Sequence, residues 1–338
     1  MLLLSEHDVR TLLTMDDLIQ TMESALVEFS AGRVRQPLRT VVEVGESHAF
    51  FGVMPAYLPV STSHPLSQVE GHASAALGTK LVTVFGSNAQ IGLPTHLATI
   101  VLLDATTGEL LSIMDGRYIT EARTAAVSAV SVKLLARTNG GVLAIIGSGV
   151  QARSHLAALS RVRALREVRV WSPSDDRRRA FAREMQPETT APIRPVASAQ
   201  QAVADADLVV LATSAREPVI RNEWIADGAH IAAVGACRPD QREMDTALVR
   251  RARVFVDSRT GAFTEAGDLV LPMREGVIDE NHIAGELGEL AGGVVDGRRS
   301  PGDVTVFKSL GMAVEDVTAA HLAYTRATER GLGRGIVL

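Results

Sequence analysis

The sequence predicts an α/β protein in which a Rossmann-type parallel sheet domain is combined with a mixed α+β domain. Residues 142–256 alternate short apolar strands with helical stretches, which is typical of a parallel sheet covered on both faces. Residues 39–115 hold short β-rich runs separated by turn residues, which is typical of a mostly antiparallel sheet. A chain of 338 residues is also long enough for two cores.

The mixed domain is predicted to begin with a helix. Thr14 and Asp17 match a helix cap, and apolar residues recur at helical spacing until Gly32 ends the run. Residues 60–77 are rich in Ser, His and Gly, and we expect them to form a surface loop. The β-rich runs are 40–44, 50–53, 80–85, 98–103 and 110–114.

A helix over residues 119–136 leads into the parallel sheet. A last helix, from residue 312 to about 330, is expected to return to the first domain. We therefore expect one domain from residues 1–119 with 312–338, and a Rossmann domain from 120–311. The strands of the second domain are expected at 142–146, 168–171, 208–212, 231–234 and 254–256.

Composition excludes several other classes of protein. A net charge of −5 gives no electrostatic reason to expect nucleic acid, and no run of Lys and Arg suggests a membrane surface. The nine histidines show no metal-ligand spacing, so no metal is expected. Cys237 is the one cysteine, which fits a reducing compartment. With no signal peptide and no membrane span in the sequence, we expect a cytoplasmic protein.

The segment GSGVQA at 147–152 is the main functional motif. It follows a fully apolar strand and opens a helix. Gly147 allows the tight turn, and Gly149 lets the backbone approach a pyrophosphate that the helix N-terminus holds. Ala152 replaces the third glycine and still permits close packing of helix and strand. Because strand, turn and helix are all in place, the motif favours dinucleotide binding over an ordinary turn.

The next strand ends at Trp171 and is followed by Ser172, Pro173 and Ser174. An NAD enzyme usually has an acid at this tip for the ribose hydroxyls. Small hydroxyls with arginines nearby, beginning at Arg177, instead suit a 2′-phosphate. We therefore expect NADPH, with NADH as the alternative. In the other interpretation, these arginines only face water at a helix start.

Arg39, Lys80 and Arg123 stand in otherwise apolar surroundings. Each alone is typical of a surface side chain, but together they could hold a substrate carboxylate. His96 is either a proton donor, a cofactor contact or a structural residue. Cys237 follows a strand of the second domain, where it is either a site residue or a small buried thiol.

Several segments resemble the ornithine cyclodeaminase/mu-crystallin family, and the mu-crystallin (ketimine reductase) branch most closely. The resemblance covers nearly the whole chain. It rests on QPLRT (36–40), GVMPAY (52–57), TKLVT (79–83), MDG (114–116), RTAAVS (123–128), GVQA (149–152), GACRPD (235–240) and FKSLGM (307–312).

This resemblance implies a homodimer whose first domain serves dimerisation and substrate binding. It implies that Arg39, Lys80 and Arg123 hold the substrate carboxylate, and that Glu265 and Cys237 border the pocket. The cofactor would be lined by Thr95, His96, Ser148, Val150, Gln151, Ser172, Thr213, Ser309 and Leu310. Arg123, Ser214 and Val234 complete the candidate cofactor residues, together with the phosphate turn and strand tip described above.

Two departures from the family pattern bear on activity. Cys237 stands where the ornithine deaminases carry a catalytic Asp, and Gly52 and Val53 replace a glutamate that orients water in those enzymes. The loop 60–77 is also longer than expected.

The resemblance therefore implies an imine reductase that converts a cyclic or linear α-imino acid to an L-amino acid. Lys80 or His96 would keep the imine protonated. The open alternatives are an alanine dehydrogenase-like enzyme, an iminosuccinate reductase, an ornithine cyclodeaminase, and a non-catalytic NADPH-dependent protein that binds a small ligand such as thyroid hormone.

Overall fold

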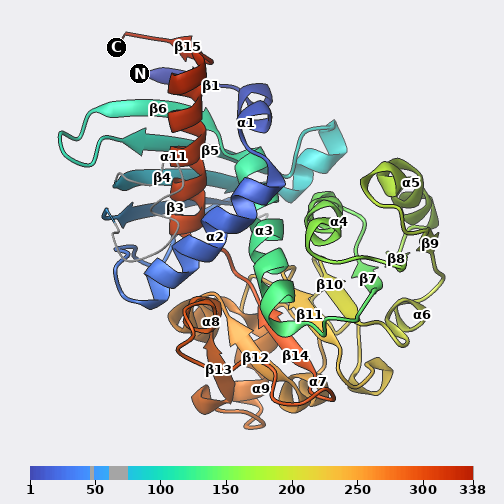
Figure 1. Cartoon of the computed structure of the whole chain (residues 1–338). Helices are drawn as coiled ribbons and strands as arrows, with labels where there is room; N and C mark the ends of the chain where they lie inside the picture. Colours follow the sequence, from blue (N-terminus) through green and yellow to red (C-terminus); the bar gives the residue numbers. More distant parts are fainter. Residues whose placement is uncertain (46–48, 61–74, 338) are drawn as a thin grey trace. The chain divides into compact units, whose positions relative to one another are not determined.

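The computed structural model describes residues 1–45, 49–60 and 75–337. The chain divides into two compact units, Met1–Arg123 with Met312–Leu338, and Thr124–Gly311 (Figure 1). Sequence analysis placed the domain boundaries after residues 119 and 311. Each unit is built around its own sheet, and the α/β class with a parallel sheet is confirmed.

The sheet of the first unit has seven strands in the order β15-β1-β6-β5-β4-β3-β2. The strands from β2 to β6 pair antiparallel with their neighbours, and β1 pairs parallel with β6. The bounds are β1 (Leu2–Leu4), β2 (Thr40–Val44), β3 (Ala49–Leu58), β4 (Ala76–Val84), β5 (His96–Leu103), β6 (Leu110–Asp115) and β15 (Arg334–Gly335).

Two predictions in this sheet were wrong at their boundaries. The run predicted at 50–53 is part of the longer strand β3, which continues through Pro55. A proline is tolerated there because the pairing with β2 ends at Thr40 and Val53, so its missing N–H leaves no gap in that ladder. Residues 76 and 77, predicted as loop, begin β4. Residues 61–74 of that loop lie outside the described residues.

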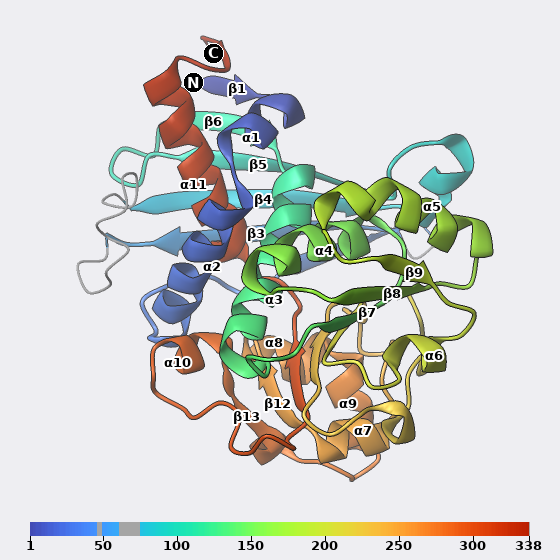
Figure 2. The ribbon, with the colours of Figure 1, turned by 45° about the vertical axis from the view of Figure 1, so that its right-hand side comes forward.

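Three helices lie on one face of this sheet (Figures 1 and 2). The longest, α11, packs against β3, β4, β5 and α2. A capping box begins α2, where the Asp17 backbone N–H donates to Thr14 Oγ1 at 3.2 Å. The helices are α1 (Glu6–Leu12), α2 (Met15–Ser30) and α11 (Ala313–Arg330).

The two faces of the first sheet differ in burial. Met54, Lys80, Ile100 and Met114 form one cross-strand row, and all four side chains are buried. Residues of the opposite parity stay partly exposed, although most are apolar. We call them the open face of the sheet, and its members include Val53, Leu77, Leu81, Leu97, Val101 and Ile113.

The second unit holds an eight-stranded sheet in the order β13-β12-β14-β11-β10-β7-β8-β9, and all of its strands are parallel. β9, β13 and β14 were not predicted. β13 contains a glycine and a glutamate, and β14 ends in a lysine, so neither reads as an apolar run. The bounds are β7 (Val142–Ile146), β8 (Glu167–Trp171), β9 (Ile193–Pro195), β10 (Leu208–Leu211), β11 (His230–Ala233), β12 (Arg253–Val256), β13 (Ile283–Glu286) and β14 (Thr305–Lys308).

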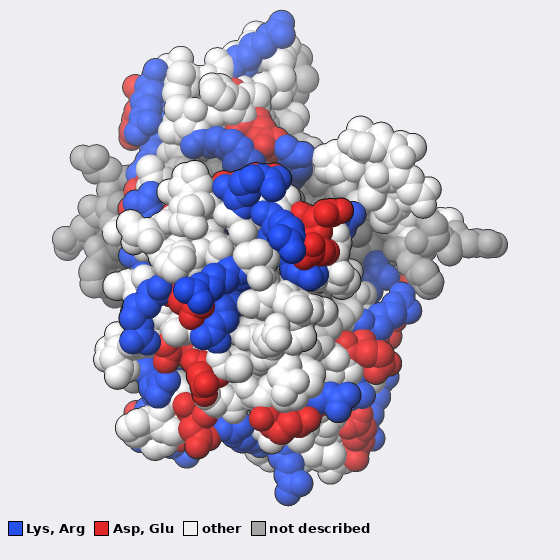
Figure 3. Space-filling view, turned by 90° about the vertical axis from the view of Figure 1, so that its right-hand side faces the viewer, with Lys and Arg blue, Asp and Glu red and all other residues white. Residues whose placement is uncertain are grey.

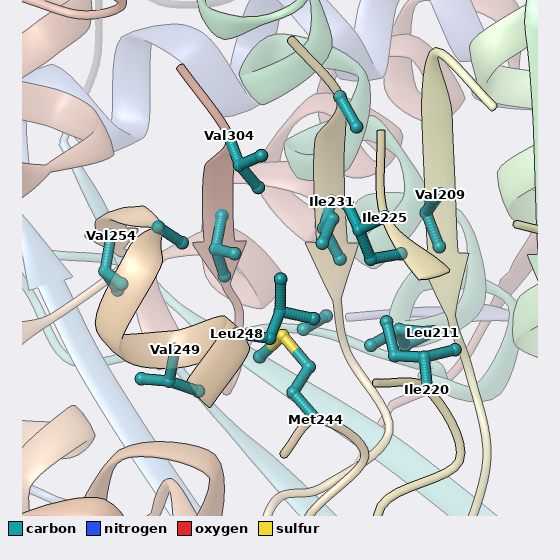
Figure 4. Close-up of a cluster of buried hydrophobic side chains, with 14 of the residues drawn as sticks. Val209, Leu211, Ile220, Ile225, Ile231, Met244, Leu248, Val249, Val254 and Val304 are labelled. Atoms are coloured by element: carbon teal, nitrogen blue, oxygen red, sulfur yellow. The ribbon is translucent and has the colours of Figure 1, made fainter. Parts of the chain in front are cut away.

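Buried aliphatic side chains from these strands and from the helices beside them form the core of the second unit. Val209, Ile231, Leu248 and Val254 belong to it, and Figure 4 shows how they pack together. In the part of the chain that the structure describes, no helix is long and apolar enough to cross a membrane. Helix α3 (Arg117–Leu135) begins in the first unit and continues into the second. The other helices of the second unit are α4 (Val150–Val162), α5 (Asp175–Met185), α6 (Ala199–Val203), α7 (Thr246–Arg251), α8 (Arg259–Glu265), α9 (Gly267–Arg274) and α10 (Leu287–Ala291).

Candidate active site

A buried cluster of charged side chains lies in the first unit. Lys80 Nζ is 2.6 Å from Asp316 Oδ2. Arg123 donates to two carboxylates, from Nε to Asp316 Oδ1 at 3.0 Å and from a terminal nitrogen to Glu315 Oε2 at 2.6 Å. The exposed fractions of all four side chains are 5% or less. We call these four residues the ionic cluster.

The local fold explains why these charges meet. Lys80 occupies the buried row of β4, which faces α11. Glu315 and Asp316 lie in the first turn of α11, where carboxylates are favoured by the free N–H groups of the helix. Gln36 Oε1 accepts a 2.9 Å hydrogen bond from the Val314 backbone N–H, which ties the segment before Arg39 to the same helix start.

Burial and neighbouring charges shift the titration of this cluster. Burial lowers the pKa of Lys80 to about 8, although Asp316 beside it opposes the shift, and Arg123 and Arg39 add to it. Burial also lowers the pKa of His96 to about 4, with further contributions from Lys80 and Arg123. At neutral pH Lys80 is therefore mostly protonated and His96 is neutral.

Glu315 and Asp316 were missed by sequence reasoning. Two acids at the start of a helix are typical of an ordinary helix N-terminus, so their residue types gave no signal of a site. Burial of Asp316 would raise its pKa, but Arg123 and Lys80 hold the pKa of this carboxyl below its ordinary value. Both acids are therefore integral parts of the cluster.

The phosphate turn in the second unit has the geometry that its glycines predicted. Gly147 has a φ of +125°, and a Cβ there would lie 2.4 Å from the carbonyl oxygen of Ala212. Gly149 is the N-cap of α4, and a Cβ there would meet nothing within 4 Å. The backbone at Gly149 is thus open to a phosphate group at the N-terminus of a 13-residue helix.

The segment after β8 presents the hydroxyl groups of serines and the exposed side chain of Arg177. Ser148 Oγ donates to Ser172 Oγ at 3.0 Å. Arg178 and Arg179 both pair with Asp175, at 3.0 and 2.6 Å. Arg177 is exposed and makes no ion pair with any described residue. Figure 3 shows the α5 side of the second unit, where basic and acidic side chains lie beside one another.

The remaining candidate cofactor residues of this unit follow the carboxyl ends of β10, β11 and β14. Parallel sheets bind their ligands at this edge. Asp257 accepts hydrogen bonds from the backbone N–H groups of Leu310 and Gly311 at 2.5 and 2.7 Å. Cys237 Sγ donates to the Val234 carbonyl at 3.4 Å. The sets that lie at this edge are Thr213 and Ser214, Val234 and Cys237, and Ser309 and Leu310.

Other predicted residues fall outside that edge. Thr95, His96 and Arg123 belong to the first unit, and Glu265 is the half-buried last residue of α8 in the second. Among residues 1–45, 49–60 and 75–337, no group of His, Cys, Asp or Glu is arranged to hold a metal ion.

The parallel sheet with its phosphate turn has the architecture of a dinucleotide-binding domain. Residues 1–331 match the model of the ornithine cyclodeaminase/mu-crystallin family. The chain belongs to this family.

Three relatives illustrate its range. Ketimine reductase mu-crystallin of Mus musculus is 43% identical over 310 residues, which is 91% of each chain. The structure of Thermococcus litoralis Delta(1)-pyrroline-2-carboxylate reductase in complex with NADH and L-proline has a TM-score of 0.92 and 40% identity, and covers 99% of this chain and 100% of its own. An archaeal alanine dehydrogenase dimer with bound NAD has a TM-score of 0.91 and 29% identity, and covers 99% and 98%.

Proposed function

We propose that this enzyme reduces an α-imino acid to an L-amino acid with NADPH, or alternatively NADH. The observation that carries this proposal is the buried pairing of Lys80 and Arg123 with Asp316. A protein that only stores a ligand has no need to bury two cations. The similarity to a ketimine reductase and to a pyrroline-2-carboxylate reductase supports the same reaction class.

The cations of the site suit a substrate that carries a carboxylate. Arg39, Lys80 and Arg123 are cationic, Glu315 and Asp316 are anionic, and the field of Arg39 reaches Lys80. A carboxylate is held best by an arginine, whose planar fork can make two parallel hydrogen bonds.

Of Lys80 and His96, Lys80 is the better candidate for the group that keeps the imine nitrogen protonated. Its ammonium has a pKa lowered to about 8, so it is charged at neutral pH and gives up a proton more readily than an ordinary lysine. His96 has a pKa lowered to about 4 and carries no spare proton at neutral pH. The bound dinucleotide supplies the hydride, and the protein supplies position and charge.

A substrate panel tests the function. The purified enzyme is mixed with NADPH or NADH and with pyrroline-2-carboxylate, piperideine-2-carboxylate or open-chain imino acids, and loss of the reduced nicotinamide absorbance is followed. L-ornithine with NAD⁺ or NADP⁺ forms a parallel arm, in which proline and ammonia are measured. We expect imine reduction and little ornithine cyclisation, since Cys237 replaces the acid that the deaminases carry. Proline from ornithine at a rate equal to imine reduction would overturn this proposal.

The tip of β8 leads to a prediction about cofactor preference. Replacing Ser172 with Asp should weaken NADPH binding by about tenfold, because the new carboxylate repels the 2′-phosphate, while NADH binding is retained. Ser172→Ala is the control, since it removes the hydroxyl without adding charge. Fluorescence titration of both dinucleotides measures the effect. Tighter binding of NADH than of NADPH by the unaltered protein would contradict the predicted preference.

We also propose that the open face of the first sheet is the interface of a homodimer. This face is apolar and partly exposed in the single chain, and an exposed sheet face of this kind is typical of a protein interface. The archaeal alanine dehydrogenase, which covers nearly the whole chain, is a dimer.

The dimer proposal predicts the effect of a charge on this face. Val101→Asp places a carboxylate in the middle strand β5 and should convert the protein to monomers, as measured by analytical ultracentrifugation. Val294→Asp is the control, because Val294 is 74% exposed and belongs to the second unit. A Val101→Asp variant that keeps the oligomeric state of the unaltered protein would exclude this face as the interface.

A further inference from the structure

Glu243, which lies in the second unit before α7, joins two loops at the carboxyl edge of the parallel sheet. Its side chain is fully buried. One carboxylate oxygen accepts from the Thr213 backbone N–H and from Thr213 Oγ1, both at 2.7 Å. The other accepts from the backbone N–H groups of Gly235 and Ala236, at 2.8 and 3.2 Å. Thr213 follows β10 and Gly235 follows β11, so a single carboxylate holds the ends of two neighbouring strands.

The backbone around Glu243 is itself anchored. Asp268 Oδ1 accepts from the backbone N–H groups of Glu243 and Met244 at 2.7 and 3.1 Å. The other oxygen of Asp268 lies 3.3 Å from Lys308 Nζ at the end of β14. Glu243, Asp268 and Lys308 are all completely buried. This arrangement links the ends of β10, β11 and β14 through charged groups rather than through apolar packing.

The close packing of one loop shows how tightly Glu243 is held. A Cβ at Gly235 would lie 2.5 and 2.6 Å from the two Glu243 carboxylate oxygens and 2.2 Å from the Thr213 carbonyl oxygen. Real side chains do not approach so closely, so the loop after β11 accepts only glycine at this position. The Glu243 carboxylate is therefore in close contact with the backbone of this loop.

The order of the strands indicates which end of the dinucleotide these loops receive. The phosphate turn follows β7, and the tip expected to hold the adenosine ribose follows β8 on one side of it. β10 and β11 lie on the other side of β7. A dinucleotide whose pyrophosphate sits at the turn must place its nicotinamide end beyond β10.

We propose that Glu243 is a positioning residue, which holds the loops after β10 and β11 in the conformation that receives the nicotinamide end of the cofactor. This inference rests on the dinucleotide of the proposed function. It assigns to Glu243 no contact with the reacting atoms, because all four of its hydrogen bonds go to the protein itself.

The titration of Glu243 provides an additional readout. Burial raises the pKa of Glu243 to about 7, while Lys308 opposes the shift and Asp268 adds to it. The charged and titratable groups that face this cluster are Asp268 from α9, Lys308 from β14, and Cys237 from the loop after β11, which interacts with Lys308. A proton on Glu243 occupies an oxygen that otherwise accepts hydrogen bonds, so dinucleotide binding should weaken as the pH falls through about 7.

Glu243→Gln tests the proposal through binding rather than turnover. The amide nitrogen would face N–H groups that need an acceptor, so the dissociation constants of NADPH and NADH should rise about tenfold. ADP, which carries only the adenosine half, should bind unchanged, and the pH dependence near neutrality should disappear. Glu243→Asp keeps the charge but shortens the side chain, and should give a smaller loss with the same selectivity.

Asp207→Asn is the matched control. The carboxylate of Asp207 accepts from the backbone N–H groups of Gly141 and Val142 at 2.8 and 2.9 Å, at the opposite edge of the same sheet. The Asp207→Asn substitution should lower thermal stability and leave the ratio of the NADPH and ADP affinities unchanged. Equal weakening of NADPH and ADP by Glu243→Gln, or no weakening of either, would overturn the proposal. If the unaltered protein binds NADPH but reduces no imine, the proposed function fails while this inference is still tested by the ratio.

Discussion

Replacing Arg123 with alanine is expected to lower kcat/KM for an α-imino acid by about 100-fold or more. The loss corresponds to about 3 kcal/mol, which is the scale of a charge-assisted contact made in a buried site. Lys80→Ala should have an effect of the same order, and its kcat should also lose part of the dependence on pH near 8, where the Lys80 ammonium titrates. Steady-state kinetics over a pH series measures both effects.

Two control variants distinguish loss of substrate binding from a general loss of folded protein. Arg123→Lys keeps the charge but loses the planar fork, so it should recover only part of the activity. Arg137→Ala removes another arginine that pairs with a carboxylate, Asp207, at 2.7 Å, and should leave kcat/KM nearly unchanged. Turnover at the unaltered rate by both alanine variants of the ionic cluster would show that the substrate binds elsewhere.

The second large effect is expected on stability. Asp316→Asn should lower the free energy of unfolding by roughly 3–5 kcal/mol, because it leaves Lys80 and Arg123 buried with too few negative partners. Chemical denaturation at neutral pH measures this loss. Glu184→Gln is the control: Glu184 pairs with Arg153 at 2.8 Å but is 52% exposed, so less than about 1 kcal/mol should be lost.

The pH dependence of stability should follow the same cluster. The pKa of Asp316 is lowered in the folded protein, so its ionisation stabilises the fold above the ordinary value of 3.8, and this contribution is lost as the pH falls through the folded pKa. The Asn variant lacks this contribution. Its acid unfolding should therefore begin at a higher pH than that of the unaltered protein, and an equal midpoint for the two proteins would contradict the assignment.

Local patterns predicted some of these features well, and the reason is physical. The phosphate turn depends on a strand, two glycines and a helix that are adjacent in the chain, so Gly147 and Gly149 could be read directly. Lys80 and Arg123 were singled out as candidates because a cation in an apolar stretch is unusual, but the expectation that each alone lies at the surface was wrong, since both are buried. Their carboxylate partners were not found, since Glu315 and Asp316 lie about 190 residues from Arg123 and their positions match an ordinary helix start.

The same limit applies in the second unit. β14 was missed because it has only two apolar residues, between Thr305 and Lys308, and the structure shows that this lysine is buried beside Asp268. Glu243 carries no signal in the sequence, because the partners of its side chain are a hydroxyl and backbone N–H groups, which any residue type could supply. Residues that position other residues act through tertiary contacts. Local spacing in the sequence does not reveal such contacts.

The first unit is discontinuous, and this has a consequence for how the protein forms on the ribosome. Lys80 and Arg123 are synthesised before residues 124–311, whereas Asp316 on α11 is synthesised after them. While the second unit emerges and folds, Glu315 and Asp316, which pair with the two cations, have not yet been synthesised, so β4 cannot yet be buried at low cost. The nascent chain should therefore complete its dinucleotide-binding unit before its substrate site, and a released chain that ends at residue 311 should bind NADPH but have no ordered substrate site.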